Sequence, residues 1–339
     1  MNTAEYLWNA ARRKPKGVLP ILSFPAVSKM GVTVGELVWD AGLQARAMKT
    51  VADELETVAA VTLMDLSVEA EAFGAQIRFA DNEVPVITGQ LVTDEDDAEA
   101  LKVPEVGAGR TGTCLEAVRL AKAQITDRPV LAGVIGPYSL AGRLCDVTEI
   151  MYLCYDEPET VHAVLDKVTE FLTAYCLAFR EAGADGVVLA EPLAGLLSPE
   201  LADEFSNPYV KKIIDAVQTE SFAVIYHNCG SSVAKMPEKV FALGAAGYHF
   251  GNAVSMKAML EAAPKDALCL GNIDPAGELM HGTPESVTET TQKLMAECGG
   301  FENFLPSTGC DVPPGARWEN IYAFFNAIGL NQKSCVKDR

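Results

Sequence analysis

The sequence contains no long hydrophobic run and is poor in positive charge. In its 339 residues no stretch of about 18 apolar residues occurs, and segment 1–17 lacks the apolar core of a signal peptide. We therefore expect a cytoplasmic protein without a membrane partner. Lys and Arg total 27 against 46 Asp and Glu, a net charge of -19. Because phosphate binding depends on clustered Lys and Arg, this deficit argues against nucleic acid as a partner. It also argues against a substrate with many carboxylates, unless the cations gather in one cleft.

Histidine is scarce, low-complexity segments and internal repeats are absent, and the cysteines cannot form a complete set of disulfides. The chain has 4 His and 9 Cys, and an odd number of thiols leaves at least one unpaired. In the cytoplasm we expect these thiols to be mostly reduced. Those without a pairing pattern are expected to pack as small hydrophobic residues: Cys114, Cys145, Cys154, Cys176, Cys269, Cys298 and Cys335.

Short apolar runs alternate with longer helical patterns along the chain. The runs that predict strands are 19–23, 60–66, 129–135, 186–191, 222–227, 246–250, 267–272 and 303–308. The helical patterns are 34–58, 112–126, 157–182, 198–218, 231–243, 255–263, 283–298 and 316–329. Eight alternating units predict an α/β fold, a closed (β/α)8 TIM barrel with a parallel sheet.

One segment, 74–110, interrupts this rhythm. It contains two short β-like runs around Asp81 and then an acidic run at 93–97, which we interpret as a solvated loop or the start of a helix. We predict a hairpin insertion after the second unit. The simplest division is a single domain over 1–339, with 1–17 as a helical lead-in.

Reactive groups of a (β/α)8 barrel lie where strands end and βα loops begin. The fifth predicted strand ends at His227 and is followed by Cys229, and the eighth is followed by Cys310. Residues two apart in extended backbone point the same way, so His227 and Cys229 can both face the barrel mouth. One imidazole and two thiolates suit zinc, and three protein ligands leave the fourth position open, as in catalytic sites. The same residues also fit a packed Cys pair beside a hydrogen-bonded His.

Further polar residues end other predicted strands. Asp65 and Glu191 are candidates for a displaceable zinc ligand, a partner of the ligating His or a substrate contact, and the alternative is a structural hydrogen bond or ion pair. Asn272 belongs with them as a candidate substrate contact, or it holds the loop after the seventh strand. His249 can line the mouth without binding metal. His162 is expected on a helix surface and His281 in a loop.

Several segments resemble the uroporphyrinogen decarboxylase superfamily, and the similarity runs from about 18 to 328. The matching residues are Met64-Asp-Leu-Ser67, Glu69-Ala-Glu-Ala-Phe-Gly74, Gly136-Pro-Tyr-Ser-Leu-Ala141, Gly271-Asn-Ile-Asp-Pro275, Gly282-Thr-Pro-Glu285, Ser307-Thr-Gly-Cys-Asp311, Pro313-Pro314 and Glu319-Asn320. The fold that this resemblance implies is the barrel already inferred.

The superfamily has two main branches, and two features are similar to the second. Members of the decarboxylase branch carry Arg at the end of the first strand, and they need no metal. In this chain the corresponding segment, 23–29, contains no Arg. Cobalamin-dependent thiol methyltransferases, typified by methylcobalamin:coenzyme M methyltransferase, carry zinc ligands that match His227, Cys229 and Cys310. This resemblance implies zinc, methylcobalamin or another corrinoid as methyl donor, a small thiol acceptor and a corrinoid protein as partner.

The identity of the acceptor stays open at this point. No cluster of basic residues near the predicted mouth marks a sulfonate site, so coenzyme M, homocysteine and other small thiols all remain candidates. Two other functions also remain as alternatives. One is a metal-independent decarboxylase in which Asp65 holds pyrrole N–H groups, and the other is a non-catalytic corrinoid- or zinc-binding barrel whose metal is fully ligated by protein.

Overall fold

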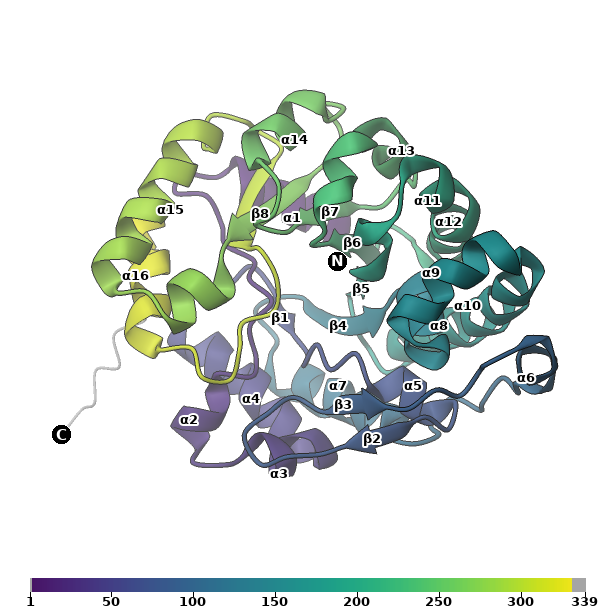
Figure 1. Ribbon diagram of the computed structural model, residues 1–339. Coiled ribbons are helices and arrows are strands. Elements are labelled where there is room, and N and C mark those ends of the chain that lie inside the picture. Colours follow the sequence, from purple (N-terminus) through teal and green to yellow (C-terminus); the bar gives the residue numbers. More distant parts are fainter. Residues whose placement is uncertain (1, 331–339) are drawn as a thin grey trace.

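The computed structural model describes residues 2–330 and forms a barrel of parallel strands enclosed by helices (Figure 1). Every strand neighbour in the main sheet is parallel. In sheet order the strands are β1 (Ala60–Val61), β4 (Val130–Ile135), β5 (Gly186–Ala190), β6 (Ala223–Asn228), β7 (Gly247–Phe250), β8 (Cys269–Ile273) and β9 (Phe304–Thr308). This order confirms the predicted TIM-barrel class.

The gap between β9 and β1 is filled by segment 18–21, which was wrongly predicted as a regular strand. Val18 forms an isolated parallel bridge with Thr57, and the Leu19 N–H donates to the carbonyl of Pro306 at 3.1 Å. The ladder is interrupted because Pro20 and Pro306 have no N–H to donate. The barrel is thus closed by an irregular eighth stave.

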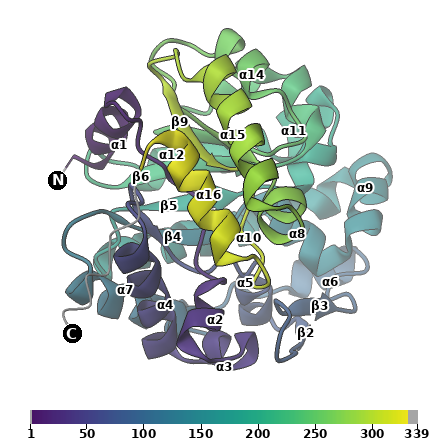
Figure 2. The same ribbon diagram turned by 90° about the vertical axis from the view of Figure 1, so that its left-hand side faces the viewer.

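The strands are buried along their whole length, which is why they read as continuous apolar runs rather than as alternating ones. One buried cluster takes residues from successive strands, among them Leu131, Val188, Ile225, Leu270 and Leu305. The same cluster includes Leu7 and Ala11 of the N-terminal helix. Figure 2 shows α1 (Thr3–Arg12) at one end of the barrel and α9 (Val147–Asp156) with β2 (Gln76–Arg78) and β3 (Val86–Thr88) towards the other.

The remaining helices surround the sheet. They are α2 (Ala26–Met30), α3 (Val34–Trp39), α4 (Ala41–Glu54), α5 (Val68–Ala72), α6 (Glu95–Ala100), α7 (Thr111–Gln124), α8 (Pro137–Cys145), α9 (Val147–Asp156), α10 (Pro158–Glu181), α11 (Pro199–Phe205), α12 (Asn207–Val217), α13 (Pro237–Phe241), α14 (Met256–Ala262), α15 (Pro284–Cys298) and α16 (Trp318–Ile328). Short helical turns precede three of them: η1 (Leu193–Leu196), η2 (Ser231–Lys235) and η3 (Pro275–Met280).

Two long predicted helices are in fact broken. The pattern at 34–58 divides into α3 and α4 at Asp40, whose side chain accepts a hydrogen bond from the Leu43 N–H at 2.8 Å and so starts a new helix. The pattern at 198–218 divides into α11 and α12 at Ser206, one residue before a helix that carries Pro208 in its first turn. Both breaks occur at helix-starting residues inside an uninterrupted apolar pattern.

The predicted hairpin insertion is present beside the barrel. Strands β2 (Gln76–Arg78) and β3 (Val86–Thr88) pair antiparallel, with Ile77 opposite Ile87. The acidic run then starts α6, where Asp94 accepts the N–H of Asp97 at 2.9 Å. Within residues 2–330 no helix combines the length and the apolar character needed to cross a bilayer.

Candidate metal centre at the barrel mouth

The three predicted ligands come together at the carboxyl end of the barrel. His227 lies in β6, Cys229 directly follows this strand, and Cys310 lies two residues beyond the end of β9. Their donor atoms all lie within 4.8 Å of one another, and the Cys310 Sγ is 3.6 Å from Nε2 of His227. Parallel pairing brings these strand ends to one edge, so residues 83 apart in sequence share one site.

The two thiols share a proton in an almost buried setting. The Cys310 thiol donates to Cys229, and this hydrogen bond together with the nearby His227 lowers the pKa of Cys229 to about 4 despite burial. The same interaction and burial raise the pKa of Cys310. The interaction therefore favours the thiolate form of Cys229, which is the form that ligates a metal.

A chain of hydrogen bonds fixes which nitrogen of His227 carries the proton. His227 Nδ1 is 2.7 Å from Nδ1 of His249, whose Nε2 is 2.7 Å from the Ser307 hydroxyl, and that hydroxyl is 2.6 Å from the carbonyl of Leu19. The carbonyl only accepts, so Ser307 donates to it and accepts from His249 Nε2–H. His249 Nδ1 is then a lone pair that accepts from His227 Nδ1–H. The free lone pair of His227 is therefore on Nε2, facing the thiols.

Burial supports this proton arrangement. His227 and His249 are 2% and 1% exposed, and they face each other across the β6–β7 register. Burial, and secondly the neighbouring His227, holds the pKa of His249 well below its usual value, so this imidazole is neutral. A ligating His is commonly oriented by a hydrogen bond from its second nitrogen, and here the acceptor is another imidazole.

The donor set fits zinc. One neutral imidazole and two thiols match the ligand types of zinc sites, and three protein ligands are the number in catalytic ones. Among residues 2–330, no further His, Cys, Asp or Glu joins this group. A fourth ligand position is thus left for something other than these protein groups.

Two close backbone contacts explain why glycines surround the thiols. A Cβ on Gly251 would lie 2.5 Å from the Cα of Cys229, and a Cβ on Gly230 would lie 2.3 Å from the Cα of Gly195. Such distances are far below van der Waals contact, so a side chain at either position would displace the Cys229 turn. The loop after β7 and η1 can approach the ligand only because these positions lack a Cβ.

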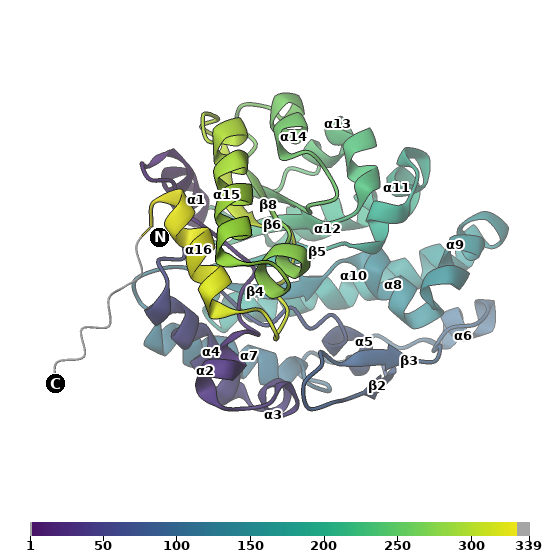
Figure 3. The same ribbon diagram turned by 60° about the vertical axis from the view of Figure 1, so that its left-hand side comes forward.

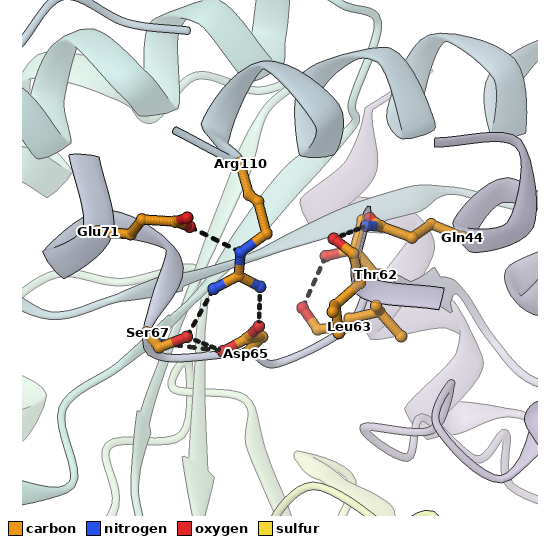
Figure 4. A network of polar contacts seen from close by, with 8 residues as sticks. Gln44, Thr62, Leu63, Asp65, Ser67, Glu71 and Arg110 are labelled. Carbon is orange, nitrogen blue, oxygen red and sulfur yellow. Dashed lines mark hydrogen bonds and ion pairs between the residues drawn. The ribbon is translucent and has the colours of Figure 1, made fainter. Parts of the chain in front are cut away.

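Asp65 lies at the mouth but is enclosed in a polar network (Figure 4). Its Oδ1 accepts from the backbone N–H and hydroxyl of Ser67 at 3.0 and 2.6 Å, and its Oδ2 forms an ion pair with Arg110. Arg110 also contacts Glu71 at 2.6 Å, and its side chain is 1% exposed. The network joins the end of β1 to α5 and α7. Contact of Asp65 with substrate stays a prediction, and its carboxylate is occupied by these partners.

Glu191, directly after β5, caps a helix rather than joining the metal ligands. It is 0% exposed, and its two oxygens accept the N–H groups of Tyr138 and Ser139 at 3.0 and 2.6 Å, at the start of α8. Burial raises its pKa to about 7 despite these bonds. Its substrate-binding role also stays a prediction.

Asn272 holds the neighbouring loop. Its Nδ2 donates to the carbonyls of Gly251 and Val254 at 3.0 and 2.9 Å, so it fixes the loop that packs against Cys229. This corresponds to the structural alternative for Asn272, and a substrate contact is untested.

The other predicted His and Cys lie away from the three ligands. His162 is not a free surface residue: it is half-buried, stacks on Phe205 with a centroid distance of 4.9 Å and hydrogen-bonds Tyr209. His281 ends η3 and is exposed, as a loop residue would be. Cys335 lies outside the described residues, and the remaining predicted structural cysteines are buried or half-buried: Cys114, Cys145, Cys154, Cys176, Cys269 and Cys298.

Sequence reasoning missed the hydrogen-bond chain from His227 through His249 to Ser307, and it missed the buried Arg110. His249 was assigned only to the lining, and Ser307 was quoted only for its resemblance. The signal for His249 was its position at the same level as His227 in the next parallel strand. Nothing local marked Arg110, because its partners Asp65 and Glu71 come from a segment distant in sequence.

Comparisons with known proteins identify the family of this chain. The uroporphyrinogen decarboxylase (URO-D) family model matches residues 4–329. A methylcobamide:CoM methyltransferase of Methanosarcina acetivorans is 30% identical over 320 residues, 91% of this chain and 92% of the relative. A uroporphyrinogen decarboxylase of Chlorobaculum tepidum is 28% identical over 256 residues, 71% and 70% of the two chains.

Solved structures show the same architecture. A methyltransferase from Methanosarcina mazei superposes with a TM-score of 0.85 over 97% of this chain and 98% of that one, at 23% identity. A B12-independent methionine synthase from Shewanella sp. W3-18-1 gives 0.56 at 15% identity. Since the family model covers nearly all described residues, the chain belongs to the uroporphyrinogen decarboxylase family.

Proposed function

We propose that this protein transfers a methyl group from a methylated corrinoid, free or protein-bound, to a small thiol such as coenzyme M. The observation that carries the proposal is the convergence of His227, Cys229 and Cys310 at the mouth, with Nε2 of His227 held as a lone pair. Similarity to methylcobamide:CoM methyltransferases over 91% of the chain supports the same activity. Homocysteine or another thiol is the finer alternative for the acceptor.

In this proposal the three residues hold zinc. When bound, zinc lowers the pKa of a thiol at its open position, so that the sulfur is a thiolate at neutral pH. The thiolates of Cys229 and Cys310 balance the charge of the divalent ion, which keeps an additional sulfur electron-rich and nucleophilic. His249 keeps the His227 proton on Nδ1, away from the ligand position.

The overall reaction balances without an oxidant or reductant. A bond forms between the acceptor sulfur and the methyl carbon, and the cobalt–carbon bond breaks with its electron pair staying on cobalt. The thiol proton leaves to solvent. The products are a thioether and the reduced corrinoid, and the corrinoid reaches the mouth either free or on a partner protein.

The two alternative functions fit the described residues less well. A decarboxylase that held pyrrole N–H groups with Asp65 would first have to remove that carboxylate from Arg110 and Ser67. A purely structural metal would need a fourth protein ligand, and the ligand group in residues 2–330 has three members. Both points favour the methyltransferase.

The first test measures zinc content and methyl transfer on one set of variants. We expect roughly one zinc per chain in the wild type and transfer from methylcobalamin to coenzyme M. Cys310→Ala should lose at least 100-fold in turnover and most of its zinc, because the metal keeps only two protein ligands. Cys298→Ala, a buried cysteine on α15, is the matched control and should behave as wild type. Full zinc and turnover in Cys310→Ala would disprove the assignment.

A further inference from the structure

A hollow at the mouth contains an arginine without a partner. Arg143 lies on α8, and the hollow of about 230 Å³ is lined further by Met64, Leu66 and Ser67 after β1 and by 84–87 of the hairpin. Arg143 is the only charged residue that lines this hollow, and the other seven lining residues are apolar or neutral. The positive group therefore faces a mainly apolar space.

Arg143 is half-buried and has no ion-pair partner among residues 2–330. Its Nε is buried and has no hydrogen-bond partner, and no carboxylate among residues 2–330 forms an ion pair with this side chain. Burial lowers the pKa of Arg143, and no neighbouring acid offsets this effect. By contrast, Arg110, which donates to the Ser67 hydroxyl beside the hollow, forms ion pairs with both Asp65 and Glu71. In a protein of net charge -19, an unpaired half-buried arginine is an exception.

The position of Arg143 is fixed by the fold. Helix α8 starts at the carboxyl end of β4, and Glu191 binds its first N–H groups. The residues after β1 lie at the same end of the barrel as the residues after β6 and β9 that hold the thiols. Figure 3 shows the hairpin and α5 below α8, on one side of the mouth. The guanidinium thus lies at the same end of the barrel as the thiols.

We propose that Arg143 is the anion-binding residue of this mouth. A guanidinium presents several N–H donors in a planar fork that pairs bidentately with an oxyanion, and such an anion would supply the missing counter-charge. The ligand is a small oxyanion carried by a substrate: the sulfonate or carboxylate of the acceptor thiol, or the phosphodiester of a corrinoid nucleotide. The identity of these substrates rests on the proposed function. A single desolvated arginine also explains why the sequence shows no basic cluster.

Kinetics with matched substrates separate the two sources. For Arg143→Gln we expect the KM for coenzyme M to rise about tenfold or more, while the KM for 2-mercaptoethanol, which has the same thiol without the sulfonate, stays unchanged. If the phosphodiester is the anion, the KM for methylcobalamin rises instead and that for methylcobinamide, which lacks the nucleotide, does not. Arg143→Lys should recover part of the loss, because it keeps the charge but not the fork.

Direct binding tests the site without chemistry. Titration calorimetry with ethanesulfonate, which has no thiol, should show binding to the wild type and a loss of about tenfold or more in Arg143→Gln. If the corrinoid phosphodiester is the anion, ethanesulfonate binds both equally and cyanocobalamin shows the loss. Arg119→Gln, at an exposed arginine on α7, is the control and should match wild type.

The outcomes separate this proposal from the proposed function. Arg143-dependent anion binding in a protein that transfers no methyl group would retain the site and overturn the methyltransferase. If the protein transfers methyl groups and Arg143→Gln binds every anionic and neutral probe as tightly as the wild type does, the anion site is overturned and the methyltransferase is retained. A fall in turnover that is the same with coenzyme M and 2-mercaptoethanol, and with methylcobalamin and methylcobinamide, would assign Arg143 to the structure of the mouth and also overturn it.

Discussion

At the scale of single residues, His249 determines the protonation of its neighbour. It accepts from His227 on one side and donates to Ser307 on the other, and both bonds are 2.7 Å long. His249→Phe keeps a ring in the space but removes the imidazole that accepts the His227 proton. The only acceptor left for Nδ1 of His227 among its described contacts is the more distant backbone carbonyl of residue 249, at 3.3 Å, so the lone pair is held less firmly on Nε2. We expect zinc affinity to fall about 10- to 100-fold. Competition with a chelator at fixed pH measures this change.

A conservative variant distinguishes orientation from packing. In His249→Gln the amide oxygen can accept from His227 and the amide N–H can donate to Ser307, so most of the affinity should return. Wild-type zinc affinity in His249→Phe, with an unchanged circular dichroism spectrum, would contradict the role of the relay.

The grouping of His227, Cys229 and Cys310 could be predicted from sequence because each lies at or just after the end of a predicted strand. His227 and Cys229 are two apart at a strand end, and Cys310 follows another strand. The relay could not be read in the same way, since His249 and Ser307 meet His227 only through the register of neighbouring strands. Arg143 gave no signal, because what distinguishes it is the absence of a partner in three dimensions.

At the scale of elements, Arg110 joins the end of β1 to α5 and α7 through two carboxylates. Arg110→Met removes the charge and leaves Asp65 and Glu71 in a site where the arginine side chain is 1% exposed. We expect the free energy of unfolding to fall by about 3–5 kcal/mol, because buried carboxylates lose their counter-charge. Urea unfolding measures the difference.

An exposed ion pair provides the comparison for this prediction. Arg119 and Glu116 are 54% and 50% exposed, so Arg119→Gln should change the free energy of unfolding by less than about 1 kcal/mol. If both variants shifted the urea midpoint equally, the network around Arg110 would have no special weight.

Secondary structure was predicted well where one rule decides it. The buried runs at 129–135 and 303–308 are strands, because both faces are covered. The run at 19–23 failed since prolines remove ladder donors, and the run at 34–58 failed since Asp40 starts a second helix within it. Apolar periodicity alone does not report these interruptions.

At the scale of the whole molecule, stability should depend on pH through buried acids, among them Glu69, Glu191 and Asp311. Burial raises the pKa of Glu191 and of Glu69 to about 7, above the usual value of 4.5. Because the pKa of each group is higher in the folded protein than in the unfolded chain, the group stabilises the fold fully below about pH 4.5. This stabilisation is lost as the pH rises from 4.5 through about 7. We expect the free energy of unfolding to fall by roughly 2–3 kcal/mol per group between pH 5 and 8, as an order of magnitude.

Single variants divide this dependence. Glu69→Gln and Glu191→Gln should each reduce the slope measured by urea unfolding at several pH values by a comparable amount, whatever their effect on absolute stability. One oxygen of Glu69 has no hydrogen-bond partner, whereas both oxygens of Glu191 accept hydrogen bonds. The Glu69→Gln variant should therefore lose less stability than Glu191→Gln. A slope unchanged in both variants would show that other groups govern it.

The irregular segment at 18–21 joins the candidate metal centre to the first and last strand positions of the barrel. The relay that orients His227 ends on the carbonyl of Leu19, 288 residues from Ser307. The first and last staves meet only when the barrel has closed, so the acceptor that sets the ligand tautomer does not exist before then. We therefore expect metal affinity to depend on closure of the barrel. A partly folded chain contains His227, Cys229 and Cys310, but it lacks the hydrogen-bond chain that holds the His227 proton on Nδ1.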